Sequence, residues 1–457
     1  MQLKDKKILV VGLARTGVAV VRFLAARGAQ VTVTDMRDED KLADSLAELA
    51  DLEINLELGR HVPYSFLMAD LIVVSPGVPM DIKPLAMARS QKRRVVSEVE
   101  LASWFIDAPM IAITGTNGKT TTTTLTGEIF RACGFDTFVG GNIGRPLIEL
   151  ACSGEKVARV VVELSSFQLE TIASFRPRWA VLLNITEDHL DRYPDMNSYQ
   201  AAKARLFENL TGADFMVLNV DDPRVMQAAA NAPARCVPFS GAGLLEEGMS
   251  LADGTLVWRW DGAETRFPAM ELHIGGQHNL ENVMAALIPP LVEGCPPAVA
   301  WGAATAFRGL PHRMELVAES NGVRWYDDSK GTNVGSVVKS LAGLPAPVTL
   351  IAGGKDKHGE LAPLKSLIAD RVRELILIGE AAPRMAAAFA GLTSIRHAGS
   401  MAEAVELAAE LTPAGGTVLL SPGCSSFDMF SSYEERGRIF AAAVKALTDP
   451  GEAAHGA

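Results

Sequence analysis

The sequence predicts an α/β protein of three domains, each built on a mostly parallel sheet. Three observations support this fold class. Short apolar strands alternate with helical patterns along nearly the whole chain, as in parallel sheets covered by helices. The length of 457 residues fits roughly three domains of ordinary size. Glycine-rich turns join a strand to a helix in the first two series of elements, which is typical of folds that bind nucleotides.

The first series predicts a Rossmann-like domain over residues 1–98. Its expected elements are strands at Ile8–Val11, Val31–Thr34 and Leu71–Ser75 and helices ending near Arg27 and over Lys41–Ala50. The turn VGLARTG at 11–17 resembles the dinucleotide-binding fingerprint, with Ala14 at its second glycine. Asp35 ends the next strand, where a carboxylate could accept hydrogen bonds from a ribose or a base. A tight turn followed by an exposed aspartate is the plainer interpretation.

The second series predicts a central domain of the P-loop ATPase type over residues 99–309. Its expected strands are Met110–Thr114, Arg159–Leu164, Trp179–Asn184 and Phe215–Val220, with a small antiparallel insertion near Gly254–Trp260. A third series predicts a Rossmann-like domain over 310–457. Its expected strands are Val323–Asp327, Val348–Ala352, Glu374–Ile378 and Thr417–Leu420.

The stretch GTNGKTT at 115–121 follows the first strand of the central domain and opens a helix. This arrangement presents backbone N–H groups and one cation to a phosphate. A full Walker A motif would have glycine where Ile113 stands, so only the compact G-x-x-G-K-T is present. Lys119 could bridge terminal phosphates, and the Thr120 hydroxyl could ligate Mg²⁺. We therefore favour phosphate binding over a glycine turn with a solvated lysine.

Three further residues in the central domain suggest chemistry. Glu163 ends an apolar strand, where a charged side chain usually needs a partner such as Mg²⁺. The plainer interpretation is an exposed strand end. His189 follows the next strand and could bind a metal or a ligand. Lys203 lies in an otherwise apolar helical stretch, and sequence physics alone favours a lysine whose tip reaches water.

Charge and cysteine usage narrow the class of partner. Lys+Arg number 43 and Asp+Glu 54, a net charge of −11, so no basic field favours nucleic acid. The five cysteines are scattered and form no C-x-x-C pair, which fits a reducing cytoplasm better than disulfides or zinc. No apolar window is long enough to span a membrane. We expect a cytoplasmic protein without membrane insertion, and a monomer because no helical zipper is evident.

Taken together, these motifs resemble those of the Mur ligases, ATP-dependent amide-forming enzymes of bacterial cell-wall synthesis. The matching stretches are GTNGKTT, the strand-end Glu163, TEDHLDRY at 186–193 and AAKARLFEN at 201–209. In the third domain, LPHR at 310–313, DDSKGTN at 327–333 and SPGCSSFD at 421–428 look like the branch that adds D-glutamate. The resemblance implies ATP, D-glutamate and UDP-N-acetylmuramoyl-L-alanine as substrates, an acyl phosphate intermediate, and two Mg²⁺ ions.

The resemblance also implies roles for individual residues. Those implied for catalysis are Lys119, Glu163, His189 and Lys203, and those for metal binding are Thr120, Glu163, His189 and Lys203 as a carbamate. Those implied for ATP are Gly115, Thr116, Asn117, Gly118, Lys119, Thr120, Thr121, Asn279, Asn282, Arg313, Asp328 and Lys330. Those implied for the UDP-sugar are Arg15, Thr16, Asp35, Arg37, Ser75, Gly77, Asn142 and His189. Those implied for D-glutamate are Thr332, Lys357, Ser426, Phe427 and Tyr433.

Some alternatives stay open at this point. Lys355 could meet the D-glutamate carboxylate in place of Lys357. A folylpolyglutamate-synthase-like ligase would share the central fold, although the VGLARTG turn, Asp35 and DDSKGTN argue against it. A P-loop kinase or nucleotide hydrolase would need only the phosphate loop. An NAD-dependent dehydrogenase would use the VGLARTG turn but leaves GTNGKTT unexplained.

Overall fold

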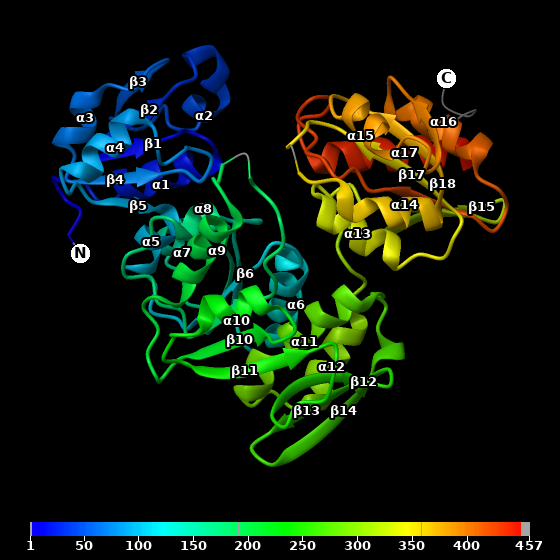
Figure 1. The fold of residues 1–457 in the computed structure, drawn as a ribbon. Coiled ribbons are helices and arrows are strands. Elements are labelled where there is room, and N and C mark those ends of the chain that lie inside the picture. The colour runs from blue at the N-terminus through cyan, green and yellow to red at the C-terminus, as the bar shows by residue number, and fades with distance from the viewer. Residues whose placement is uncertain (1, 191, 358, 449–457) are drawn as a thin grey trace, which may run out of the picture. The chain divides into compact units, whose positions relative to one another are not determined.

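The computed structural model describes residues 2–190, 192–357 and 359–448, and the chain divides into two compact units. Unit 1 consists of Met1–Ile185, Asn197–Leu272 and Leu280–Ala306. Unit 2 consists of Thr186–Met196, His273–Asn279 and Phe307–Ala457. Unit 1 holds two sheets and unit 2 holds one (Figure 1).

The first sheet of unit 1 is entirely parallel, with strand order β3-β2-β1-β4-β5. Its strands are β1 (Lys7–Val11), β2 (Gln30–Asp35), β3 (Asn55–Leu58), β4 (Leu71–Val74) and β5 (Val95–Ser97). Its helices are α1 (Arg15–Ala25), α2 (Ala43–Ala47), α3 (Pro63–Met68), α4 (Lys83–Ser90) and α5 (Glu98–Ser103). Residues 8–11 are each at most 1% exposed, because helices cover both faces of the central strands.

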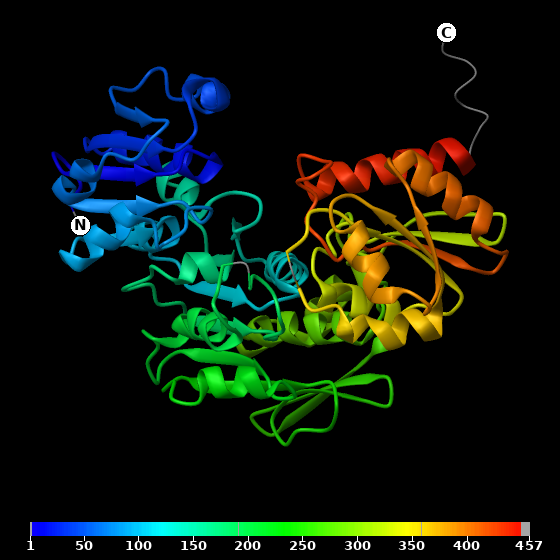
Figure 2. The same ribbon diagram turned by 45° about the horizontal axis from the view of Figure 1, so that its top comes forward.

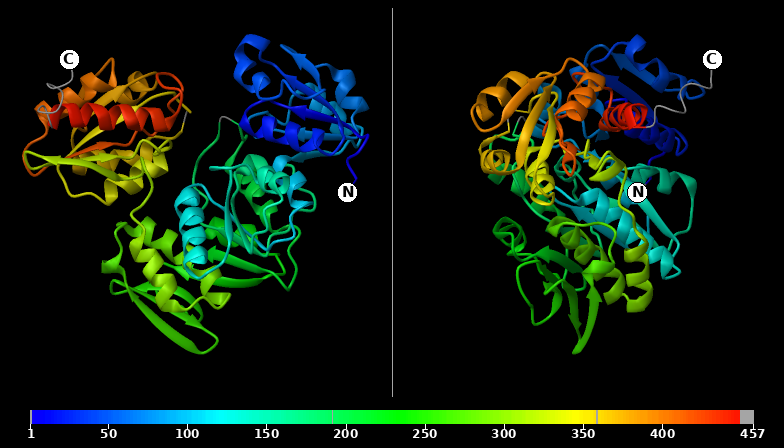
Figure 3. Two further views of the ribbon diagram at one scale, coloured as in Figure 1. Left: turned by 180° about the vertical axis from the view of Figure 1, so that it is seen from behind. Right: turned by 90° about the vertical axis from the view of Figure 1, so that its right-hand side faces the viewer.

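The second sheet of unit 1 has the order β14-β13-β12-β11-β10-β9-β6-β8-β7. Its parallel part comprises β6 (Met110–Thr114), β7 (Thr137–Gly141), β8 (Arg159–Glu163), β9 (Trp179–Leu182), β10 (Phe215–Asn219) and β11 (Arg235–Ser240). The strands β12 (Gly248–Ala252), β13 (Thr255–Trp260) and β14 (Ala263–Pro268) add an antiparallel extension at one edge. Figure 3 shows this extension as the green hairpin, and it confirms the predicted antiparallel insertion.

The helices that accompany the second sheet cover its parallel part. They are α6 (Lys119–Ala132), α7 (Leu147–Ser153), α8 (Ser166–Leu169), α9 (Met196–Ala204), α10 (Pro223–Ala229), α11 (Gln277–Val292) and α12 (Pro297–Ala306). The helix α6 begins directly after the loop that follows β6 and packs against α12. Its buried face includes Leu125, Ile129 and Phe130, which explains why this helix holds a fixed position beside the sheet.

The sheet of unit 2 has the order β15-β16-β20-β17-β18-β19, parallel except for the edge strand β15. Its strands are β15 (Glu315–Ser320), β16 (Val323–Asp327), β17 (Val348–Gly353), β18 (Val372–Ile378), β19 (Ser394–His397) and β20 (Thr417–Leu420). Its helices are α13 (Val334–Ala342), α14 (Lys365–Arg371), α15 (Ala382–Phe389), α16 (Met401–Leu411) and α17 (Tyr433–Thr448). Figure 2 shows α17 beside α16, and the two helices pack against each other.

These observations confirm the predicted α/β class with mostly parallel sheets. The boundaries near residues 98 and 309 stay predictions. Among the described residues, no helix combines the length and the apolar character needed to cross a membrane.

Candidate active site

The phosphate loop lies between β6 and α6, as predicted. Gly118 caps α6 with φ +85°, and a Cβ at this position would lie 2.1 Å from Asn282 Oδ1. Only glycine fits both the backbone angle and the space. Lys119 Nζ donates to the carbonyl oxygens of Gly115 at 3.0 Å and Thr116 at 2.8 Å, so its ammonium lies over the loop. The first amides of a helix together with a lysine form a binding site for anions.

Asn184 fixes the shape of this loop, and the sequence did not single it out. Its Oδ1 accepts from Asn117 N at 2.9 Å, and its Nδ2 donates to Asn117 O at 3.0 Å. Its backbone carbonyl accepts from Thr116 N at 2.9 Å. A polar residue just beyond the buried strand β9 was the available signal, because the ends of neighbouring parallel strands lie side by side.

Glu163 is a buried carboxylate of unit 1 with a hydrogen-bond donor at only one of its two oxygens among the described residues. It is 1% exposed at the end of β8, next to β6. Its Oε1 accepts from Asn142 Nδ2 at 2.8 Å, whereas Oε2 is buried with no hydrogen-bond partner. A buried carboxylate oxygen without a protein donor is usually satisfied by an ordered water or a cation. Its chemistry fits Mg²⁺, which prefers hard oxygen ligands, and the plainer interpretation of an exposed strand end is wrong.

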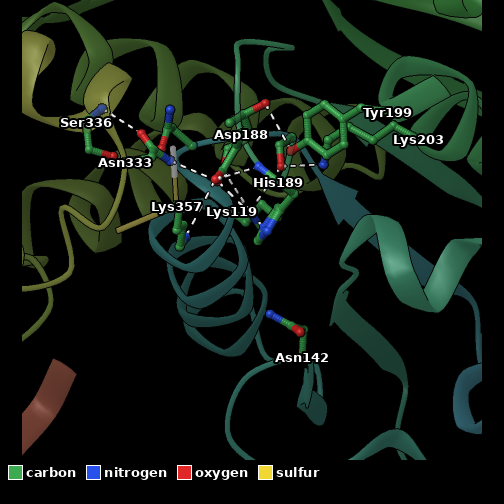
Figure 4. A network of polar contacts seen from close by, with 12 residues as sticks. Lys119, Asn142, Asp188, His189, Tyr199, Lys203, Asn333, Ser336 and Lys357 are labelled. Carbon is green, nitrogen blue, oxygen red and sulfur yellow. Dashed lines mark hydrogen bonds and ion pairs between the residues drawn. The ribbon is translucent and has the colours of Figure 1, made fainter. Parts of the chain in front are cut away.

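Lys203 is also buried, at 1% exposure, so the interpretation of a lysine with a solvated tip is wrong. Its side chain lies on the inner face of α9, and Nζ donates to Gly115 O at 2.8 Å. The ammonium also lies 4.7 Å from the centre of the Tyr199 ring (Figure 4). Tyr199 OH in turn donates to Thr116 Oγ1 at 3.3 Å. Lys203 therefore reaches the backbone of the same loop that Lys119 covers.

A cavity of about 520 Å³ opens at the carboxyl ends of the strands of the first sheet. Six of the eight residues expected at the UDP-sugar line it, namely Thr16, Asp35, Arg37, Ser75, Gly77 and Asn142. Arg15 is exposed and not among its lining residues, and His189 belongs to unit 2.

Asp35 is a fixed anion in this cavity. Its carboxylate accepts from Leu13 N at 2.8 Å and from Arg37 Nη2 at 2.8 Å. Burial opposes its ionisation, but the hydrogen bonds from Arg37 and Leu13 outweigh burial and lower its pKa to about 2. Asp35 is therefore charged at neutral pH and can accept hydrogen bonds from a ligand.

In unit 2, a cavity of about 690 Å³ is lined by two of the residues expected at ATP, Asn279 and Arg313. Asp328 is buried nearby, where Ser340 Oγ and Ser421 Oγ each donate to its Oδ2 at 2.7 Å. Burial raises the pKa of Asp328 to about 6 despite these two bonds. Lys330 Nζ lies 3.7 Å over the Tyr433 ring.

His278 is a further cavity residue that the sequence did not suggest. Burial, followed by the charges of Lys339 and Arg313, lowers its pKa to about 4, so it is neutral at pH 7. A neutral imidazole together with Arg313 gives the lining of this cavity a donor and an acceptor as well as positive charge.

A second cavity of unit 2, of about 290 Å³, contains two of the residues expected at D-glutamate, Thr332 and Lys357. Lys357 Nζ forms an ion pair with Asp188 Oδ1 at 3.6 Å, and Asn333 Nδ2 donates to Asp188 Oδ2 at 3.0 Å (Figure 4). Asp188 is a lining residue that the sequence did not single out. His189 also lines this cavity, in a left-handed conformation with φ +57°.

The other residues expected at D-glutamate do not line this cavity. Ser426 is buried, Phe427 is 69% exposed, and Tyr433 lies beneath Lys330. Lys355 is exposed and is not among the lining residues either, so the geometry favours Lys357 as the lysine of this cavity.

Comparisons with known proteins give the family. The profile described as Mur ligase middle domain matches residues 113–289. The Mur ligase MurD-like N-terminal domain matches 6–97, and the Mur ligase glutamate ligase domain matches 312–424. A UDP-N-acetylmuramoylalanine–D-glutamate ligase of Geobacter sp. is 65% identical over 446 residues, covering 98% of this chain and 99% of the relative. The chain belongs to the Mur ligase family. A ligase of the same name from Citrifermentans bemidjiense is also 65% identical, with the same coverage.

Solved structures share the fold of this Mur ligase at low identity. A pseudomurein peptide ligase type C from Methanothermus fervidus has a TM-score of 0.61 at 19% identity, covering 97% of this chain and 100% of its own. The UDP-N-acetylmuramate-alanine ligase of Thermotoga maritima has a TM-score of 0.59 at 17% identity, with the same coverage. FolC of E. coli, at 16% identity with a TM-score of 0.58, covers only 76% of this chain and 92% of its own.

Unit 1 of this Mur ligase thus holds a cationic phosphate loop with a buried carboxylate nearby, and unit 2 holds two cavities. The loop suits phosphate groups, and the cavity with Lys357 and Asp188 offers one cation and one anion to a zwitterion. This set of groups suits a reaction that involves phosphate transfer and an amino acid.

Proposed function

We propose that this Mur ligase joins the amino group of D-glutamate to the L-alanyl carboxylate of UDP-N-acetylmuramoyl-L-alanine, with cleavage of ATP to ADP and phosphate. The observation that carries the proposal is 65% identity along 98% of the chain to relatives that bear this activity in their names. The product is a precursor of peptidoglycan. The geometry supports the proposal through the phosphate loop of unit 1 and the cavity around Lys357 in unit 2.

The chemistry needs a phosphate donor because a carboxylate is a poor electrophile. In the proposed first step the L-alanyl carboxylate oxygen attacks the γ-phosphorus of ATP, and ADP leaves. The amine of D-glutamate then attacks the acyl carbon, loses a proton, and expels inorganic phosphate. Both steps move negative charge, so fixed cations and amide N–H groups stabilise their transition states. Lys119 and the first amides of α6 would supply this stabilisation at the phosphates.

We propose Thr120, Glu163, His189 and Lys203, the last as a carbamate, as the residues that hold two Mg²⁺ ions. When bound, Mg²⁺ would neutralise phosphate charge and act as a Lewis acid. The orphaned Oε2 of Glu163 supports this assignment. Asn142 would hold the other oxygen of that carboxylate in place, since it donates to Oε1 at 2.8 Å.

Binding roles are proposed on the same basis. The residues around the cavity of the first sheet would bind the UDP-sugar, with Asp35 as a charged acceptor. Asn279, Asn282, Arg313, Asp328 and Lys330 would contact ATP. Thr332 and Lys357 would bind D-glutamate, while Ser426, Phe427 and Tyr433 are assigned by family resemblance alone. We further propose a cytoplasmic monomer with domains over 1–98, 99–309 and 310–457.

One experiment tests the proposed function. ADP release from the purified protein is measured with UDP-N-acetylmuramoyl-L-alanine in four parallel reactions, containing D-glutamate, L-glutamate, meso-diaminopimelate or no amino acid. We expect sustained release only with D-glutamate. Equal release with L-glutamate would contradict the assignment. Sustained release without any amino acid would favour a nucleotide hydrolase.

A further inference from the structure

The loop that carries Lys357 begins at a fixed place. Gly354 has φ +130°, and a Cβ there would lie 2.4 Å from Ser425 O, so only glycine fits this position. Lys355 N donates to the same Ser425 oxygen at 2.9 Å. These contacts tie the start of the loop to the segment that follows β20, but they lie two residues before Lys357 and do not by themselves set its side chain.

Arg384, on α15, contacts the loop at Asp356 and Gly359, on either side of Lys357. Its Nε donates to Asp356 Oδ2 at 2.5 Å, and its Nη2 donates to Asp356 Oδ1 at 2.7 Å. Its Nη1 donates to Gly359 O at 3.0 Å. One guanidinium therefore holds the residue before Lys357 and the residue two positions after it. The Asp356 side chain is only 8% exposed and that of Arg384 is 37% exposed, so water screens this paired contact only in part.

These residues also lie at the amino-acid cavity. Asp356, Lys357, Gly359 and Arg384 all line the cavity of about 290 Å³ that contains Thr332. Each of the three Arg384 nitrogens already donates to the loop. Three of the five N–H groups of this guanidinium therefore donate to Asp356 and Gly359, which gives Arg384 a role in holding the loop.

We propose that Arg384 is a positioning residue that, through Asp356 and Gly359, holds Lys357 at the cavity and so sets the affinity for D-glutamate. The inference rests on the proposed function for the identity of the amino acid. A lysine at 384 cannot make two parallel bonds to Asp356 and still reach Gly359, because its ammonium is a single point charge. Asp356→Asn would keep the size and shape of the side chain but would lose one acceptor oxygen and the charge, so it should weaken the hold of Arg384 on the loop.

The test compares kcat and KM in Arg384→Ala, Arg384→Lys and Asp356→Asn. We expect the KM for D-glutamate to rise about tenfold in Arg384→Ala and nearly as much in Arg384→Lys, because a small misplacement of Lys357 weakens its contact. The KM for the UDP-sugar should change less than about twofold, since the cavity proposed for it lies in unit 1. Arg396→Ala is the matched control, because this exposed arginine of unit 2 lies outside the cavity and its ion pair, with Glu374, is long at 3.9 Å.

A double variant separates positioning from general stability. In the Lys357→Ala background, Arg384→Ala should lower kcat/KM for D-glutamate less than about twofold further, because its effect passes through Lys357. Losses that multiply in the double variant would overturn the proposal. An unchanged KM for D-glutamate in Arg384→Ala, or an equal rise for the UDP-sugar, would also overturn it. If Arg384→Ala does not fold, Arg384→Lys and Asp356→Asn carry the same comparison.

A second readout does not depend on the reaction. Amide hydrogen exchange at Lys355, Asp356 and Lys357 should be about tenfold faster in Arg384→Lys than in the wild type, and unchanged in Arg396→Ala. Unchanged exchange in Arg384→Lys would overturn the positioning role. The two proposals can fail separately. If exchange is faster in Arg384→Lys as expected but the wild type releases no ADP with D-glutamate, the proposed function is refuted and the positioning of the loop by Arg384 stands.

Discussion

The side chain of Lys203 is buried in unit 1, and its Nζ donates to the carbonyl oxygen of Gly115. A buried ammonium is costly, and its charge would repel a divalent cation at the phosphate loop. Carbamylation removes this conflict. The neutral amine adds to the carbon of CO₂, one proton leaves, and the product is an anionic carbamate with two hard oxygens suited to Mg²⁺.

The proposed carbamate at Lys203 gives the first prediction. Lys203→Ala should lose at least about a hundredfold in turnover, the range seen for groups that stabilise transition-state charge, while the protein stays folded. Added acetate should restore part of the activity, because a diffusible carboxylate can occupy the vacated space. Turnover is measured across an acetate series with a matched chloride series. Lys156→Ala, a change at an exposed lysine, should alter neither activity nor acetate response. Near-normal turnover of Lys203→Ala without acetate would contradict the role.

Asp328 gives a prediction about pH. Its pKa is raised by burial to about 6, above its ordinary value of 3.8. The protonated form therefore stabilises the folded protein at low pH, and this contribution is lost as pH rises through 6. The side chain of Asp328→Asn stays neutral at every pH. The unfolding free energy of this variant, relative to that of the wild type, should therefore rise by about 1 kcal/mol from pH 5 to pH 7.5. Denaturant unfolding at both pH values measures the gain.

Asp35→Asn serves as a control, because the pKa of Asp35 is shifted in the opposite direction to that of Asp328. The pKa of Asp35 is lowered to about 2, so its charged form stabilises the folded state above pH 4, and this stability is lost as pH falls toward 2. The Asp35→Asn protein should therefore be less stable than the wild type at pH 7.5. For Asp328, the contrary result would be that Asp328→Asn loses stability relative to the wild type from pH 5 to pH 7.5. The Asp328 carboxyl would then ionise more readily in the folded protein than its burial implies.

At the level of elements, the start of α6 depends on one glycine. Gly118 and Gly134 have nearly the same backbone angle, φ +85° and +86°. A Cβ on Gly118 would lie 2.1 Å from Asn282 Oδ1, whereas a Cβ on Gly134 meets nothing within 4 Å. The two positions therefore share the conformational cost of a side chain and differ in steric overlap.

Alanine at these two glycines gives the element-scale prediction. Gly134→Ala should cost only about 1 kcal/mol of stability, the cost of a left-handed non-glycine residue. Gly118→Ala should cost clearly more and should also weaken nucleotide binding, because either the Asn282 side chain or the start of α6 must move to make room for the methyl group. Thermal unfolding and ATP-analogue titration of both variants test this. Equal losses of stability and no loss of affinity would mean that the loop accommodates the methyl group.

The strands that the sequence could predict are the apolar ones at the centres of the sheets. β1, β6 and β17 are mostly apolar, and each was expected at nearly its observed bounds. The strands that were missed include β3 and β19, which lie at sheet edges and are half-exposed. One face of an edge strand lacks the covering layer that produces an apolar run, so its sequence resembles that of a loop.

Helix α2 shows a second limit of predicting elements from the spacing of apolar residues in the sequence. A helix was expected near Lys41–Ala50, but the structure has a 3₁₀ turn at Glu39–Leu42 and a short α2. None of the residues of α2 is buried, so packing does not extend it.

Across the whole molecule, the sequence could identify site residues that carry a distinctive motif, such as those of GTNGKTT. It could not identify Asn184, Asp188 or Arg384, because their importance comes from neighbours distant in the chain. Asp188, for example, contacts Asn333 at 3.0 Å across 145 residues. Spacing along the chain gives no signal for such a pair, and only folding brings the two together.

The division of the chain gives the last prediction, which separates the two chemical steps. Lys119 belongs to unit 1 and Lys357 to unit 2. If Lys119 serves the phosphates, Lys119→Ala should slow acyl phosphate formation at least about a hundredfold. If Lys357 binds the incoming amino acid, Lys357→Ala should leave that first step intact and weaken D-glutamate binding by about 1.5–3 kcal/mol, the worth of a charge-assisted hydrogen bond.

Rapid-quench measurements with ATP and the UDP-sugar, but without D-glutamate, isolate the first step. The wild type and Lys357→Ala should each release a burst of up to one ADP per enzyme, whereas Lys119→Ala should show none. Adding D-glutamate should then give steady turnover, with a raised KM in Lys357→Ala alone. Lys365→Ala, at an exposed lysine of unit 2, should match the wild type in both phases because it lies outside both cavities. A lost burst in Lys357→Ala would place that lysine at the phosphates rather than at the amino acid, and a normal burst in Lys119→Ala would remove Lys119 from the first step.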